Sequence, residues 1–241
     1  MSDRKKRFCL GQKRVEEKTN EIKAIPELLD CLNIKGTIIT TDAMGTQTAI
    51  VKKIRQKRAN YALALKANQG NLLEDVRLYF SEDEFPKKCA YKKTVEKARG
   101  KIEKREYWQT DDISWLSQKK EWTGLKTIIL TRNTVIGKEG ETSTEERYFI
   151  SSLPAGIEEA ARAVRGHWMA ESFHWHLDVT FREDGNHTIE KQAAYNLNIM
   201  RKLSLNILKL IEVGSKSLSL KKKRYAIGAN PEKHLEQIIN L

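Results

Sequence analysis

Two short β-branched or apolar runs, each followed by a helical pattern, constrain the fold of this chain most. Residues 36–41, Gly-Thr-Ile-Ile-Thr-Thr, have the composition of a buried strand, and a helical pattern follows over residues 46–57. A second apolar run covers residues 61–67 and leads into another helix that ends near Phe80. Strands that alternate with helices are typical of a parallel α/β sheet.

The residues before this region predict one strand and one helix. Residues 8–16 read as a strand interrupted by Gly11, and a short helix is expected to start at Asn20 or Glu21. Pro26 falls in the first turns of that helix, where proline is tolerated.

Residues 85–153 follow a different, β-rich pattern. Alternation on both sides of Arg99-Gly100 predicts a hairpin of residues 90–98 and 101–108. Residues 126–131 read as a further strand, and residues 134–152 as a second hairpin that turns at 137–140. We therefore expect a β-strand insertion within the α/β pattern.

The chain becomes helical after Pro154. One helix is expected over residues 157–179, and a second over residues 193–213. The second should bury an apolar stripe made of Leu197, Met200, Leu203, Ile207 and Leu210. A basic link, residues 215–224, should lead to a last helix after Asn230-Pro231.

The first of these helices carries the first catalytic candidate, Glu171. The residues Val164, Trp168, Glu171, Trp175 and Asp178 share one stripe, and a stripe with two tryptophans normally faces a core. A carboxylate beside aromatic surface is costly unless it meets a cation, a proton or a donor. Simple pairing with a nearby Arg or His explains the pattern equally well.

Asp42 is the second candidate, because it follows the first buried strand directly. Open α/β sheets place their ligands at the carboxyl ends of such strands. Asp is also a good N-cap, so it could instead cap the next helix. Carboxylates that converge at a strand end can hold divalent metal ions for phosphoryl transfer.

The charge favours a polyanionic partner. Lys plus Arg is 44 and Asp plus Glu is 32, which leaves a net charge of +12 in 241 residues. Nucleic acid is the usual partner for such a balance, although a single Lys-rich cluster is more often a solvated face. Without a membrane-length apolar run or a signal-peptide core, we expect a cytoplasmic protein, with Cys9, Cys31 and Cys89 reduced.

Several sequence blocks together resemble bacterial insertion-sequence transposases of the DDE class, and within them the H-repeat-associated proteins. The blocks run in family order over about residues 8–210: Gly11-Gln12, residues 19–29 (Thr-Asn-Glu-Ile-Lys-Ala-Ile-Pro-Glu-Leu-Leu), 41–45 (Thr-Asp-Ala-Met-Gly), 64–69 (Ala-Leu-Lys-Ala-Asn-Gln), 148–153 (Tyr-Phe-Ile-Ser-Ser-Leu), and His167-Trp168, Glu171, His174-Trp175, 177–179 and 181–184.

This resemblance implies a ribonuclease-H-like α/β fold with the β-strand insertion before the last acidic residue. It implies that Asp42 matches the second catalytic Asp and Glu171 the catalytic Glu. The implied ion is Mg²⁺, with Mn²⁺ as a substitute, and the implied reaction is cleavage and strand transfer of double-stranded DNA in transposition. Lys66, Arg165 and Trp168 are DNA-contact candidates by position and charge.

The chain departs from the family pattern at its start. The family's first Asp lies on an earlier strand that nothing here matches, and Asp3 stays unassigned. We therefore expect the carboxyl-terminal part of a transposase, inactive alone. Ser172 stands where Asn is usual and Asp178 where related enzymes carry Lys, and residues 185–192 replace an expected basic segment.

The resulting division has four parts. Residues 1–84 form the α/β core, incomplete at the N-terminus, and residues 85–153 the insertion. Residues 154–213 form helices that complete the core and carry the Glu, and residues 214–241 a basic link and the last helix.

Three alternatives remain open. His174 and His176 with Tyr195 would suit a tyrosine nuclease of the relaxase type, which needs a strand to align the imidazoles. Glu171 and His174 have the spacing of di-iron helix bundles, which require further motif copies. The third is a non-catalytic remnant that binds DNA, or that oligomerises with itself or with a full-length transposase.

Overall fold

The computed structural model describes residues 8–13, 21–98, 100–214 and 218–241, without the side chains of Glu21, Ala98, Met169, Ala170 and Glu171. The chain divides into two compact units. The first to be described is Val15–His167, and the second comprises Met1–Arg14 with Trp168–Leu241. None of the described helices is both long enough and apolar enough to cross a membrane.

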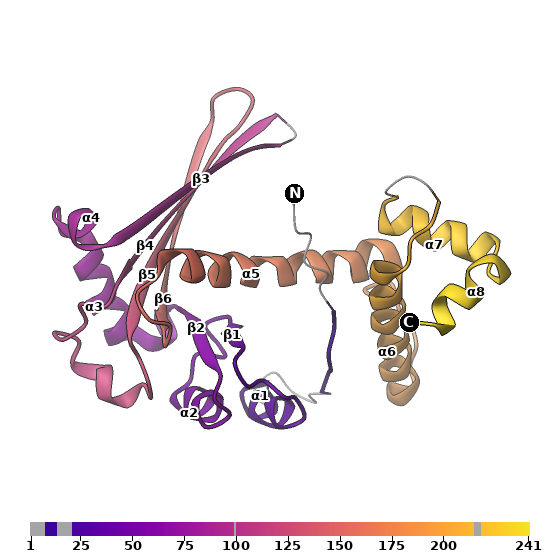
Figure 1. Ribbon diagram of the computed structural model, residues 1–241, viewed down its shortest axis with the longest axis horizontal. Coiled ribbons are helices and arrows are strands. Elements are labelled where there is room, and N and C mark those ends of the chain that lie inside the picture. The colour runs from indigo at the N-terminus through magenta and orange to yellow at the C-terminus, as the bar shows by residue number, and fades with distance from the viewer. Residues whose placement is uncertain (1–7, 14–20, 99, 215–217) are drawn as a thin grey trace. The chain divides into compact units, whose positions relative to one another are not determined.

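A six-stranded mixed sheet forms the centre of the unit Val15–His167 (Figure 1). Its order is β1-β2-β6-β5-β4-β3, with β1 and β2 parallel and every other neighbouring pair antiparallel. The predicted α/β class is confirmed. The strands are β1 (Ile38–Thr41), β2 (Asn60–Leu65), β3 (Ala90–Ala98), β4 (Lys101–Thr110), β5 (Thr127–Ile136) and β6 (Thr142–Ser151).

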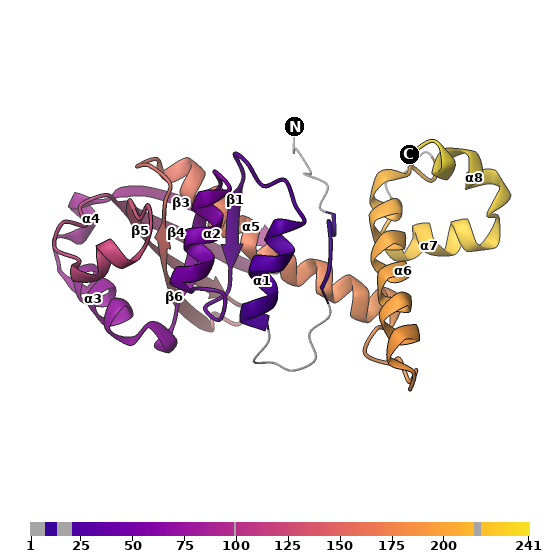
Figure 2. The same cartoon turned by 90° about the horizontal axis from the view of Figure 1, so that it is seen from below.

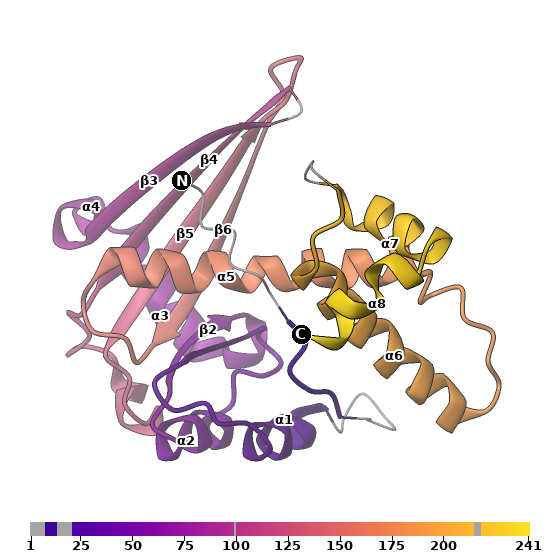
Figure 3. The same cartoon turned by 45° about the vertical axis from the view of Figure 1, so that its right-hand side comes forward.

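Strand β2 is buried on both faces. Its successive side chains point to opposite faces of the sheet and pack against different elements. Tyr61, Leu63 and Leu65 pack into the main core with α1 (Glu21–Asp30), α2 (Thr48–Gln56) and α3 (Gly70–Ser81). Ala62 and Ala64 pack on the other face, beneath the first turns of α5 (Ile157–Trp175). The small alanines allow α5 to approach closely, and Figures 2 and 3 show α1 and α2 on the face opposite α5.

The β-rich block continues this same sheet, because β6 pairs with β2 in the register Ala62↔Ser151. The predicted hairpin of β3 and β4 is confirmed. The prediction of a strand ending at residue 131 is wrong, because β5 runs unbroken to Ile136. Short helical segments fill the connections: η2 (Ala67–Gln69), α4 (Phe85–Lys88) and η3 (Ser117–Glu121).

The other unit is helical. A π-helical segment, η4 (His176–Thr180), follows the α5 helix, and α6 (Lys191–Leu210), α7 (Leu220–Ala229) and α8 (Glu232–Ile239) complete the unit. Its core joins Leu208, Ile211 and Val213 to residues of α7 and α8.

Three sequence expectations fail in this unit. Residues 8–13 form no strand, and residues 14–16 of that expected strand lie outside the described residues. The expected link is helical from Leu220 onward. The α6 stripe faces the core only near its end, where Ile207 packs against the core of the unit. Leu197, Met200 and Leu203 are 39%, 58% and 50% exposed.

Candidate functional site

Asp42 and Lys66 lie at the same edge of the sheet. Asp42 follows β1 directly and Lys66 follows β2 directly, and the two strands are parallel with Thr41 opposite Leu63. Both side chains are exposed. The sequence therefore placed Asp42 correctly at the carboxyl end of β1. The expectation that this strand is buried is wrong, because all four of its residues are half-buried and it stands at the end of the strand order.

A tight turn fixes the backbone of Asp42. Its Oδ1 accepts a hydrogen bond from the backbone N–H of Gly45 over 3.3 Å, and its carbonyl accepts one from the Thr46 hydroxyl over 3.2 Å. The Thr46 hydroxyl also lies 2.7 Å from the carbonyl oxygen of Ala64, which ties the turn to the end of β2. The alternative that Asp42 caps the next helix is wrong, because the N-cap of α2 is Gln47.

Two amide side chains that the sequence analysis did not single out hold this turn from the other strand. Asn68 Nδ2 donates to the carbonyl of Ala43 over 2.7 Å, and Gln69 Nε2 donates to the carbonyl of Thr46 over 2.8 Å. A hollow of about 490 Å³ opens beside them, between the starts of α2 and α3. The sequence signal that could have identified them is two consecutive amide residues shortly after a buried strand.

The Asp42 carboxylate fits the role of a metal ligand. It is exposed, and among the described residues it accepts one hydrogen bond, the long contact from Gly45, so its oxygens remain open to a divalent cation. Among the side chains that the structure describes, no group of three or more His, Cys, Asp or Glu residues could hold a metal ion.

Glu171 falls within α5, but its side chain lies outside the described residues. The expectation that its stripe faces a core holds for Val164, which is 1% exposed, and is wrong for Trp175, which is 55% exposed. Trp168 is half-buried. The sequence pattern thus overstated how much of this helix is covered.

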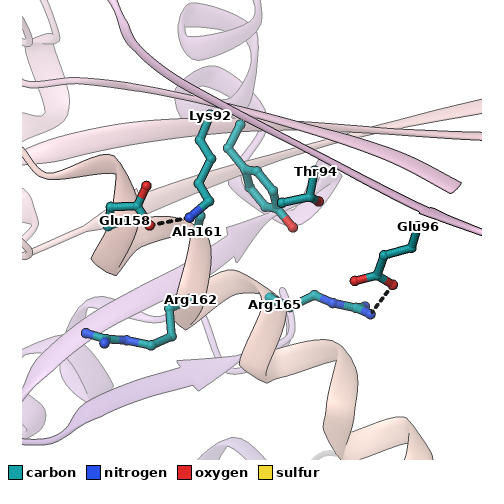
Figure 4. A pocket seen from close by; sticks show the side chains of 8 residues that line it. Lys92, Thr94, Glu96, Glu158, Ala161, Arg162 and Arg165 are labelled. Carbon is teal, nitrogen blue, oxygen red and sulfur yellow. Dashed lines mark hydrogen bonds and ion pairs between the residues drawn. The ribbon is translucent and has the colours of Figure 1, made fainter. Parts of the chain in front are cut away.

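Arg165 borders a pocket of about 310 Å³ between β3 and α5 (Figure 4). Its guanidinium lies 3.7 Å from the carboxylate of Glu96, and Lys92 pairs with Glu158 across the same space. Arg162 lines the pocket as well. The DNA-contact candidate Arg165 therefore has an acidic partner, which a phosphate would have to replace.

The two histidine-based alternatives find no support. His174 is helical and His176 begins a π-helical segment, so the strand that a relaxase-type pair needs is absent at these described residues. Burial, and secondarily the charge of Lys209, lowers the pKa of His176. A di-iron arrangement would need a cluster of ligands, and the described side chains contain none.

Comparison with known proteins decides the family. Residues 2–207 match the sequence model described as the transposase DDE domain. The chain belongs to the DDE transposase family. It is 36% identical over 230 residues to the "H repeat-associated putative transposase YhhI" of Escherichia coli K12, covering 92% of this chain and 61% of that protein. It is also 36% identical over 226 residues to the "Putative transposase YncI" of Escherichia coli O157:H7, covering 90% and 57%.

The chain thus spans about three-fifths of the length of these transposase relatives. A third relative, an "Uncharacterized protein in dhlA 3'region" of Xanthobacter autotrophicus, is 41% identical over 151 residues, covering 62% of this chain and 50% of that protein. The family match includes Asp42, Lys66, Arg165, Trp168 and Glu171, whereas α7 and α8 lie beyond its last residue.

Proposed function

We propose that this chain supplies two of the catalytic carboxylates of a DDE transposase, Asp42 and Glu171, for metal-dependent DNA cleavage and strand transfer in transposition. The observation that carries the proposal is the position of Asp42: exposed, at the carboxyl end of a parallel strand, and free of any capping role. A divalent ion, Mg²⁺ or Mn²⁺, when bound by Asp42 and Glu171, would activate water and stabilise the oxygens of the phosphodiester.

We further propose that this sheet belongs to a ribonuclease-H-like core. Strand β1 is at the end of the strand order, yet Ile39 packs on its helix-covered face and Ile38 on its α5 face. All four residues of β1 are half-buried, and a strand whose two faces are both covered is more often an interior strand than an edge strand. Its open edge would pair with the strand that carries the family's first Asp, and without that residue the chain alone is inactive.

We assign a separate role to each of four consecutive parts of the chain. Residues 1–84 supply Asp42 and the partial core, 85–153 the insertion, 154–213 the helix with Glu171, and 214–241 a basic terminal part. The partner is double-stranded DNA, at element ends and at the target, with Lys66, Arg165 and Trp168 as contacts. A protein with this activity would act in the cytoplasm, at the nucleoid.

A chimera tests this proposal. The matching segment of YhhI is replaced by this chain, and cleavage of supercoiled plasmid DNA is followed with Mg²⁺ or Mn²⁺, with intact YhhI for comparison. We expect nicking by the chimera that is lost with Asp42→Asn and with Glu171→Gln, and none by the isolated chain. Nicking that survives Asp42→Asn would overturn the assignment.

A second candidate function is a non-catalytic chain that associates with another transposase chain. Among the described residues, thirteen of the twenty large apolar side chains that are most exposed lie in the helical unit. They include the α6 residues Leu197, Met200 and Leu203. An exposed apolar stripe of this kind is typical of an interaction surface.

Molar mass in solution tests the second candidate. Association through α6 predicts a dimer or larger species by light scattering, which Met200→Lys with Leu203→Lys converts to monomer. A matched pair on the other unit, Leu78→Lys with Val95→Lys, should leave the mass unchanged, since both residues are also exposed. A monomeric native chain at all concentrations would exclude association with itself.

A further inference from the structure

Among the described residues of the helical unit, helix α7 carries the densest positive charge, in a segment to which the family match does not extend. Residues 221–224 are Lys-Lys-Lys-Arg, and the helix Leu220–Ala229 contains no acidic residue. Neither the DDE match nor the proposed catalytic residues explain this cluster.

Two of the four cations have structural roles. Lys223 Nζ donates to the carbonyls of Leu208 and Ile211, over 3.2 and 2.6 Å, and thereby satisfies acceptors at the end of α6. Arg224 donates to the carbonyl of Thr180, and its guanidinium lies 4.9 Å from the ring centroid of Phe181. These contacts fix the orientation of α7 within its unit.

The other two cations, Lys221 and Lys222, have exposed side chains. Neither forms an ion pair with any residue in the described parts of the chain. At 100° per residue they share one arc with Tyr225, which is 69% exposed, and with the small residues Gly228 and Ala229. We name these five residues the outer face of α7.

The stability of the helix does not account for this charge. Lys221 and Lys222 lie in the first turn, where the helix dipole disfavours cations. The N-cap Ser219 accepts a hydrogen bond only from the backbone N–H of Lys222, over 3.3 Å, and no acidic residue follows in the first turn. The two lysines therefore act against local stability and are compensated by no partner within the described chain.

We propose that the outer face of α7 binds the phosphate backbone of duplex DNA. Its charge is complementary to the DNA backbone, which carries one negative charge per roughly 1.7 Å of helix axis. Gly228 and Ala229 allow a close approach, and Tyr225 offers a polar aromatic side chain at the contact. This inference rests on the proposed function, because it assumes that DNA is the partner of the chain.

The distribution of apolar residues favours DNA over an anionic membrane. A membrane-bound helix inserts large apolar side chains beside its basic ones. On α7, Ala226, Ile227 and Leu220 pack into the core of the unit instead, and Tyr225 is the large side chain on the outer face. The helix thus has no apolar face to offer a lipid surface.

Salt-dependent binding of the full chain tests the proposal. The affinity for a labelled random-sequence 30-base-pair duplex is measured by fluorescence anisotropy from low to moderate salt. The variant is Lys221→Gln with Lys222→Gln, and the matched control is Lys119→Gln with Lys120→Gln, an adjacent exposed pair in the other unit. Circular dichroism verifies that both variants are folded.

We expect the α7 variant to reduce the slope of log affinity against log salt by about 2, since each phosphate contact contributes roughly 0.9. The control should retain the native slope, and Lys221→Arg with Lys222→Arg should retain it too. Equal slopes in the α7 variant and the control would overturn the proposal. So would unchanged DNA binding with loss of binding to phosphatidylserine vesicles or to a poly-Glu peptide. Absence of any DNA binding by the native chain would overturn this proposal together with the proposed DNA partner.

Discussion

Asp42 and Gly45 are joined across a turn by a hydrogen bond from the Gly45 backbone N–H to the Asp42 Oδ1, 3.3 Å long. The space around Gly45 is closed, because a Cβ atom there would lie 2.7 Å from the Cβ of Thr41. The position of the candidate catalytic carboxylate therefore depends on a residue without a side chain.

Gly45→Ala should destabilise the protein by about 1–3 kcal/mol, because the added methyl group overlaps a rigid β-branched side chain. The free energy of unfolding from urea titration measures this. Gly70→Ala is the control, since the residue is helical and its new Cβ would have no atom within 4 Å beyond its chain neighbours and the backbone of its own helix. Equal stabilities of the two variants would contradict the account of the turn.

Stability at acid pH should depend on Glu106. Burial acts to raise its pKa, but the hydrogen bonds from Tyr91, 2.8 Å, and Lys104, 3.1 Å, together with the charges of Lys104 and Lys93, outweigh burial and lower the pKa below 4.5. A carboxyl group whose pKa is lower in the folded than in the unfolded state stabilises the protein at pH values above its unfolded-state pKa. This stabilisation is lost as the pH falls through the folded-state pKa.

Glu106→Gln should therefore cost about 1 kcal/mol at pH 7. The difference between native protein and variant should shrink below pH 4.5, and urea titrations at pH 7, 5 and 3 follow it. A difference that stays the same at all three values would show that the carboxylate charge is not involved.

The cysteines should differ in reactivity. Burial raises the pKa of the Cys89 thiol to about 11, whereas Cys31 is exposed. Because the thiolate is the reactive form, iodoacetamide at pH 8 should label Cys31 well before Cys89. Peptide mass spectrometry gives both rates, and unfolding in guanidinium should make them similar. Faster labelling of Cys89 in the folded protein would contradict its burial.

Substitution of Arg165 can show whether this residue stabilises the fold or contacts DNA. Its pair with Glu96 is partly exposed, with 38% and 55% of the two side chains accessible, so Arg165→Gln should change the unfolding free energy by less than about 1 kcal/mol. If Arg165 contacts DNA, the same variant lowers duplex affinity at low salt. Lys126→Gln, at an exposed cation elsewhere in the unit, is the control. Equal affinities of both variants would remove Arg165 from the interface.

Strand β2 could be predicted from the sequence because it is buried. Each residue of β2 after Asn60 is covered, so an apolar run marks the strand. Strand β5 was cut short in prediction because only its first half is buried, and Arg132 and Asn133 belong to the half-exposed remainder. Hydrophobic periodicity and composition identify buried strand segments better than segments of a strand that extend beyond the core.

Tertiary contacts explain the failures in the helical unit. The Lys-rich sequence of α7 reads as a link, but Lys223 and Arg224 bind carbonyls 12 to 44 residues away. Local sequence cannot indicate such partners. Asp42 was found because a strand end is a local feature, whereas the roles of Asn68 and Gln69 depend on the approach of two loops.

Titration calorimetry with Mn²⁺ tests the central claim, that Asp42 and Glu171 hold a divalent metal ion, most directly. The native chain is compared with Asp42→Asn, with Glu171→Gln and with the control Asp83→Asn, whose side chain is exposed on the connection between α3 and α4. We predict weak binding by the native chain and the control, and loss of the binding heat in both carboxylate variants. Identical isotherms for all four proteins would contradict the account.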